Sequence, residues 1–182
     1  MRRTCVFIDL AFAIALLLIF SLSTSLSAQA QPGPHDALLK QHFSCNSGYE
    51  LDECLTEISI LKSDLADMPL EQLGEWSWIL VRSRDWKTIS EKLDLEPRSP
   101  AFSTLALRET FIDEALLHDV SERTETLVVT FNMSRERLRL FAVAHELAHG
   151  ICNDKNEPKA NYVAWMLLGH RSFSCLGKIK QL

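Results

Sequence analysis

Residues 145 to 149 read His-Glu-Leu-Ala-His, a spacing of residue types that is well suited to bind a metal ion. Residues four apart lie on the same face of a helix, so His145 and His149 can reach one ion. Glu146 then flanks the open coordination position. Zinc suits this donor set, polarises a carbonyl group and acidifies a water molecule. The pattern therefore predicts a Zn²⁺ site in which Glu146 serves as general base for a hydrolysis.

A helix must hold these three side chains on the correct face. The segment from Arg135 to Ile151 has apolar residues at helical spacing around most of its circumference, and Ser134 is a suitable N-cap. Such a helix is largely buried. An unpaired buried polar group costs about 1–3 kcal/mol, so the histidines and the glutamate need partners, which a metal ion would supply.

A catalytic zinc site usually has three protein ligands, and the residues after this helix offer several donors for the third. Turn-forming residues there allow the chain to reverse sharply, and Pro158 suits the first turn of a second helix. The candidates for the third ligand are Asn153, Asp154, Asn156, Glu157 and His170.

The sequence Glu-Pro-Lys-Ala-Asn follows the helix, and with the His-Glu-x-x-His pattern it is similar to the paired motifs of gluzincins, the thermolysin-like branch of the zincin metallopeptidases. This resemblance implies that His145, His149 and Glu157 bind Zn²⁺. It further implies that Glu146 is the general base and that Asn161 orients His145. The chain departs from the family pattern in its shorter connection between the two motifs and in Asn161, where aspartate is commoner.

The resemblance covers residues 134 to 169 at most, and Asp154 remains the alternative third ligand, as in aspartate-type zincins. The chain looks most like small secreted metallopeptidases, which implies a zinc-dependent enzyme that hydrolyses peptide bonds in a peptide or protein substrate. The alternatives are a non-catalytic zinc-binding interaction domain and a zinc amidase that acts on cell-wall peptides. Tyr162, His170 or Arg171 could stabilise the oxyanion.

The first 30 residues are typical of a signal peptide. Two arginines near the start precede an apolar run from Leu10 to Phe20, and Ala28-Gln29-Ala30 forms a small-x-small cleavage site. The run is short for a membrane span, so we expect cleavage, no stable membrane insertion afterwards, and a secreted or periplasmic protein. A retained membrane anchor is the alternative.

Four cysteines remain after residue 30, and in an exported chain they predict two disulfides. Three pairings are possible. We favour Cys45 with Cys54, which brackets a turn containing glycine, and Cys152 with Cys175, which ties the zinc helix to the segment after the next helix.

Residues 31 to 182 are expected to form a single zinc metallopeptidase-like domain. The whole chain has a formal net charge of −5 and no basic stripe, so nucleic acid is not an expected partner. The predicted fold class is α+β, a mostly helical, minimal zincin-like domain with a small sheet beside the active-site helix. A helical part covers about 36–95, and a part with the strands and the zinc site covers about 103–182.

Apolar periodicity predicts helices over 51–65, 70–80 and 86–93. The convincing strand candidates are 105–117 and 126–131. The second lies directly ahead of the zinc helix, where it could pair with an extended substrate or support the helix from within a small sheet. The tryptophans are interpreted as packing residues: Trp76, Trp78, Trp86 and Trp165.

Overall fold

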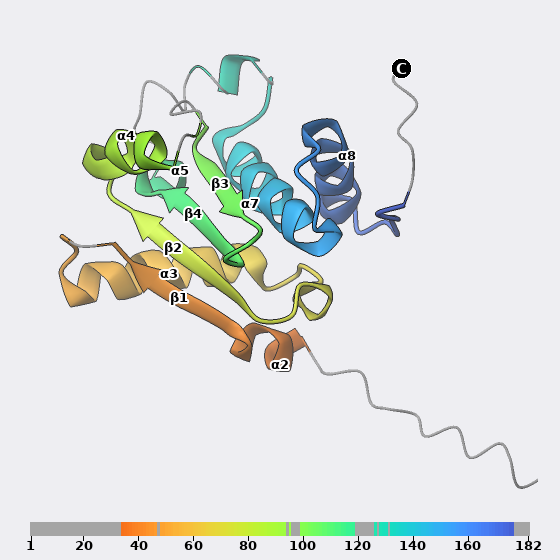
Figure 1. Ribbon diagram of the computed structural model, residues 1–182, viewed down its shortest axis with the longest axis horizontal. Helices are drawn as coiled ribbons and strands as arrows, with labels where there is room; N and C mark the ends of the chain where they lie inside the picture. Colours follow the sequence, from red (N-terminus) through yellow and green to blue (C-terminus); the bar gives the residue numbers. More distant parts are fainter. Residues whose placement is uncertain are drawn as a thin grey trace, which may run out of the picture. The chain divides into compact units, whose positions relative to one another are not determined.

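The computed structural model describes residues 34–46, 48–93, 95, 99–118, 126, 128–130 and 132–176 (Figure 1). The chain divides into two compact units, Met1–Gln31 and Pro32–Leu182, and the described residues belong to the second. The predicted signal peptide and its cleavage site lie outside the described residues. In the described part of the chain, every helix is too short or too polar to cross a membrane.

A four-stranded mixed sheet organises the fold, in the order β1-β2-β4-β3. The three strands β1 (Gln41–Cys45), β2 (Trp76–Val81) and β4 (Glu109–Asp113) run parallel to one another. The fourth, β3 (Ala101–Thr104), pairs antiparallel with β4 and forms an edge of the sheet. Together with the helices, this sheet confirms the predicted α+β class.

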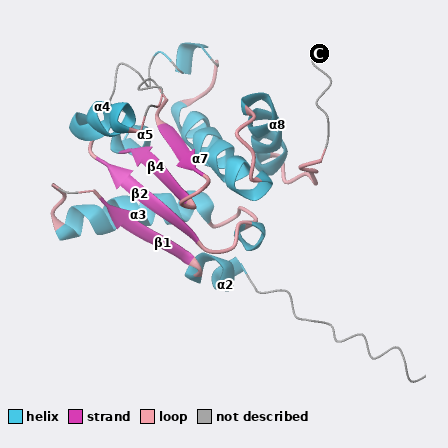
Figure 2. Cartoon of the chain, viewed as in Figure 1, coloured by secondary structure: helices cyan, strands magenta, loops and turns pink. Residues whose placement is uncertain are grey.

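Among the described residues, helices pack around the sheet (Figure 2). They are α2 (Pro34–Leu39), α3 (Leu51–Leu65), α4 (Ser83–Lys92), α5 (Glu114–His118), α7 (Arg135–Cys152) and α8 (Glu157–Leu168), with a 3₁₀ turn, η1 (Leu70–Gln72). Helices α7 and α8 pack against each other, and α7 also contacts β3. The helix with the His-Glu-x-x-His pattern therefore lies beside the edge strand.

Strand β2 separates two apolar clusters because successive side chains of a strand point to opposite faces. Trp76, Trp78 and Leu80 belong to the main core, which also contains side chains of α3, α7 and α8. Val81 packs on the other face with Trp86 of α4. The two buried indoles of β2 retain polar partners: Trp76 Nε1 donates to Thr110 Oγ1 at 2.9 Å, and Trp78 Nε1 to Gln41 Oε1 at 3.1 Å. The packing interpretation is confirmed for Trp76, Trp78 and Trp86.

Several predicted elements are wrong. Residues 70–80 form a 3₁₀ turn and then strand β2, because the apolar side chains at 76, 78 and 80 also satisfy the period of a strand buried on both faces. The predicted helical part thus supplies two of the four strands. The strand expected over 105–117 is limited to β4, and β3, for which no strand is predicted, precedes it.

The strand predicted over 126–131 is also wrong. Its described residues, Thr126 and 128–130, are helical, and Thr130 Oγ1 donates to the carbonyl of Thr126 at 2.7 Å. The β-branched residues there favour a strand, but this preference is weak and context overrides it. The described residues of this segment therefore form neither a strand that pairs with a substrate nor one that supports the zinc helix.

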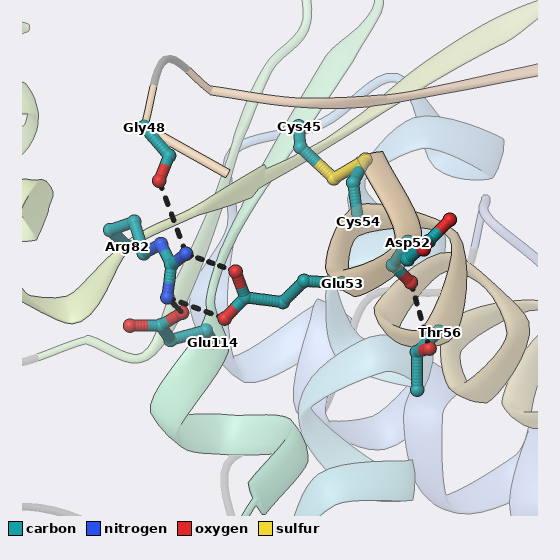
Figure 3. Close-up of a disulfide and its surroundings, with 8 residues drawn as sticks. All are labelled: Cys45, Gly48, Asp52, Glu53, Cys54, Thr56, Arg82 and Glu114. Atoms are coloured by element: carbon teal, nitrogen blue, oxygen red, sulfur yellow. Dashed lines mark hydrogen bonds and ion pairs between the residues drawn. A yellow bond between two sulfur atoms is a disulfide. The ribbon is translucent and has the colours of Figure 1, made fainter. Parts of the chain in front are cut away.

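Both predicted disulfides are confirmed. Cys45, the last residue of β1, bonds to Cys54 in the first turn of α3, and Cys152 at the end of α7 bonds to Cys175. Figure 3 shows the first bridge beside an ion-pair group in which Arg82 binds Glu53 and donates to the carbonyl of Gly48. The second bridge ties the segment after α8 to the end of the site helix.

A partly buried ion pair joins α7 to α3. Arg139 Nε donates to Asp64 Oδ2 at 2.8 Å, and its Nη2 donates to Oδ1 at 3.1 Å. The Asp64 side chain is only 5% exposed, and burial raises the pKa of its carboxyl group although Arg139 opposes this. The pair supplies the hydrogen bonds without which this carboxylate would be costly to bury.

We predict that Arg139→Met lowers the free energy of unfolding at pH 7 by about 2 kcal/mol, because it leaves the Asp64 carboxylate buried without a cation. The folded-state pKa of Asp64 then rises further above its unfolded value, so the deficit should be largest at neutral pH and shrink towards pH 4 as the group is protonated. Urea unfolding of the variant and the unmodified protein at both pH values measures this. The double variant Arg139→Met/Asp64→Leu should regain most of the stability; a deficit independent of pH would contradict the prediction.

Candidate metal centre

Three potential metal ligands converge where α7 ends and α8 begins. The donor atoms of His145, His149 and Glu157 all lie within 4.8 Å of one another. Glu157 Oε2 is 3.0 Å from His145 Nε2, and Glu157 Oε1 is 3.4 Å from His149 Nε2. The structure thus brings together the three residues that the sequence predicts as ligands.

The Nδ1 atoms of both imidazoles make hydrogen bonds that orient the rings. His145 Nδ1 donates to Asn161 Oδ1 at 2.9 Å, and His149 Nδ1 donates to the backbone carbonyl of Asp154 at 2.6 Å. Acceptor oxygens at both Nδ1 atoms favour the Nδ1–H tautomer in each neutral ring, so each Nε2 presents a lone pair. Asn161 therefore has the orienting contact that the resemblance implies.

The two Nε2 atoms lie only 3.0 Å apart and face the same carboxylate. Burial, and then the neighbouring His149, lower the pKa of His145 and disfavour the proton that could otherwise link the rings. Two imidazole nitrogens and a carboxylate that lie this close together could hold a cation. The donor set, two imidazole nitrogens and one carboxylate oxygen, matches that of catalytic zinc sites and leaves room for a further ligand.

The reversal between the two helices explains how Glu157 reaches the histidines. Asn153 ends α7 in the left-handed region, with φ 45°, and Asn156 caps α8 by accepting a hydrogen bond from the backbone N–H of Lys159 at 2.9 Å. Pro158 follows in the first turn of α8. Glu157 is consequently the first residue of a helix that packs back against α7.

Asp154, the alternative third ligand, has a different set of contacts. Its Oδ2 is 2.9 Å from the ammonium group of Lys159, and its Oδ1 accepts a hydrogen bond from the backbone N–H of Asn156 at 3.0 Å. Lys159 and this amide hold the pKa of the Asp154 carboxyl below its usual range. Asp154 thus contributes to the site through its backbone carbonyl, a role that sequence reasoning missed because any residue type could supply it.

A close approach fixes the end of α7 against the sheet. A Cβ atom at Gly150 would lie 2.4 Å from Leu73 Cδ1 and 3.2 Å from the Trp76 ring, so a larger residue does not fit without movement of its neighbours. The absence of a side chain lets α7 pack directly on η1 and β2. His149 is therefore placed by the packing of the residue that follows it.

Glu146 is a buried carboxylate beside the histidines. Its side chain contacts little solvent, its residue is only 5% exposed, and its Oε2 has no hydrogen-bond partner among the described residues. Burial raises the pKa of Glu146 to about 7, although His149 opposes the shift. A carboxylate with this pKa is well matched to proton transfer near neutral pH.

A cleft of about 320 Å³ opens over this group, and β3 forms one of its walls. Ser103 Oγ donates to the backbone carbonyl of Glu146 at 3.5 Å, a weak link between strand and helix. The cleft is lined by Leu95, Ser99, Ala101, Phe102, Ser103, Leu105, His145, Glu146, His149, Lys155 and Glu157. Sequence analysis identified four of these, and the residues of β3, Ala101-Phe102-Ser103-Thr104, have no alternation that could have revealed the strand.

The predicted oxyanion stabilisers do not line this cleft. His170 and Arg171 line a separate hollow together with residues 66–72, and Tyr162 is 46% exposed on α8. Contrary to the prediction, Trp165 is not a core residue, because 41% of it is exposed, although its ring packs against that of Phe141 of α7 at 5.0 Å.

Comparisons with known proteins do not assign the chain to a family. A scan against protein-family models gives no match, and a search of curated proteins gives no significantly similar sequence. The likeness to gluzincins therefore rests on the two short motifs, and the function has to be argued from the geometry of His145, Glu146, His149 and Glu157.

Proposed function

We propose that this protein is a secreted or periplasmic zinc metallopeptidase. The observation that carries the proposal is the convergence of two imidazole lone pairs and the Glu157 carboxylate next to the buried, unpartnered oxygen of Glu146. A purely structural zinc site has four protein ligands, whereas the described residues bring three donors together. The two disulfides and the absence of a membrane-spanning helix among the described residues are compatible with export.

In this proposal His145, His149 and Glu157 hold the zinc ion, which supplies a Lewis acid that polarises the substrate carbonyl and acidifies water. Glu146 accepts the proton of the attacking water and delivers it to the amine that leaves when the peptide bond breaks. The raised pKa of Glu146 suits both directions of this transfer. Asn161 and the carbonyl of Asp154 keep the imidazoles oriented throughout.

The position of β3 supports a peptide as the substrate. This strand is at the edge of the sheet and lines the cleft, so its outer backbone groups are available to an extended chain. A peptide that adds to such an edge aligns its backbone by hydrogen bonds, and the pockets beside it select side chains. The edge strand thus takes the role that the sequence pattern suggested for residues 126–131.

The ligand set can be tested by metal content. We predict that the purified, oxidised protein binds one Zn²⁺ per chain and that Glu157→Gln weakens the affinity at least tenfold, because an amide is a poorer zinc ligand than a carboxylate. Asp154→Asn is the matched control and should retain the ion, since its backbone carbonyl is unchanged. Competition with a chelator measures both affinities. Loss of zinc only in Asp154→Asn would reject Glu157 as the ligand.

The role of Glu146 can be tested separately from metal binding. We predict that Glu146→Gln retains one zinc ion per chain and lowers kcat by about 10²–10⁴-fold in a peptide-library assay, because the amide cannot accept the water's proton. Cleavage of cell-wall amides in place of peptides would identify the protein as an amidase. Full activity in the zinc-loaded variant would remove Glu146 from the mechanism.

A further inference from the structure

One cationic side chain lines the cleft without being used by the predicted metal site. Lys155 is exposed in the turn between α7 and α8, and it borders the cleft together with His145, His149 and Glu157. Among the described residues it has no ion-pair partner, whereas the neighbouring Lys159 binds Asp154 at 2.9 Å. The ammonium group of Lys155 is thus available to a ligand in the cleft.

The charged side chains next to Lys155 already have partners of opposite charge or face the histidines. Asp154 is neutralised by Lys159, and Glu157 faces the two histidines. Of the remaining wall, between Leu95 and Leu105, the residues that the structure describes contribute only apolar and hydroxyl side chains to the lining. With Zn²⁺ bound, the two positive charges of the ion offset the carboxylates of Glu146 and Glu157, and Lys155 leaves the cleft with an excess positive charge.

A positive cleft is unusual for this chain because its formal net charge is −5. A local field of one sign in a partly enclosed cleft attracts ligands of the opposite sign and repels those that share it. A lysine on a flexible four-carbon stem can follow a carboxylate at several positions along a bound peptide. The lining therefore discriminates between substrates by charge as well as by shape.

We infer that Lys155 makes the cleft selective for substrates that place a carboxylate close to the scissile amide bond. This inference rests on the proposed peptidase function and adds the substrate class to it. The carboxylate comes either from an acidic side chain or from the free carboxyl terminus of a short peptide. Both present the same group to the ammonium, and the substrates used in the test distinguish them.

The test compares hydrolysis of matched peptides by the zinc-loaded protein. In the first pair, one peptide has Glu and the other Gln at a position next to the cleaved bond, each such position is tested in turn, and both carboxyl termini are amidated. In the second pair, the two peptides have the same sequence, and one has a free and the other an amidated carboxyl terminus. We expect a kcat/KM ratio of about tenfold or more in favour of the carboxylate in one pair, decreasing at high ionic strength. The pair that shows the ratio identifies the source of the carboxylate.

The variants assign this preference to a residue. Lys155→Met should bring the ratio close to one, and Lys155→Glu should invert it, with zinc content unchanged in both. Lys92→Met is the matched control, because Lys92 is an exposed lysine at the end of α4 that does not line the cleft. A ratio near one in the unmodified protein, or a ratio that survives Lys155→Met, would overturn the inference.

A failure of the peptidase proposal can be distinguished from a failure of this inference. If the zinc-loaded protein cleaves none of the peptides, binding of the same pairs to Glu146→Gln is measured by calorimetry. A preference for the carboxylate that disappears in Glu146→Gln/Lys155→Met would support the role of Lys155 while rejecting peptide hydrolysis. Equal binding of both members of each pair would reject the role of Lys155 as well.

Discussion

The arrangement of this site depends on two hydrogen bonds that orient the imidazole rings of His145 and His149. The hydrogen bonds to Asn161 and to the Asp154 carbonyl turn His145 and His149 so that their Nε2 atoms face one another at 3.0 Å. The Glu157 carboxylate adds a third polar group, 3.0 Å from His145 Nε2. The fold tolerates the contact because α7 is held in place elsewhere, by Gly150 against Leu73 and Trp76 and by Arg139 against Asp64.

The side chains that stabilise the fold and the polar groups of the candidate site lie in different parts of the domain. The main core joins α3, β2 and α7 through apolar side chains, while the polar groups of the site lie at the end of α7 and the start of α8. Polar groups held this close together have to be supported by interactions outside them. The Cys152–Cys175 bridge has a similar role, since it joins the last residue of α7 to the segment beyond α8.

The elements that could be predicted from the sequence are those with short-range signals. The helix around residues 135–151, its N-cap Ser134, the second helix with Pro158 and both disulfides follow from local residue types. Strand β2 was mistaken for a helix because Leu73, Trp76 and Leu80 also fit helical spacing, and Ser77 is the one polar residue in the strand. Strand β3 has only four residues, too few for a pattern, and its position is set by pairing with β4.

Within the site, side chains with a characteristic spacing could be predicted, and backbone groups could not. The carbonyl of Asp154 acts through its position in the turn, which depends on the left-handed residue Asn153. The edge strand β3 likewise offers backbone N–H and C=O groups, and these are the same groups through which unrelated chains can add to a sheet. The strand is short, which limits such self-association. A second copy paired there would cover the cleft that β3 borders, so oligomerisation through this edge and entry of a ligand into the cleft are mutually exclusive.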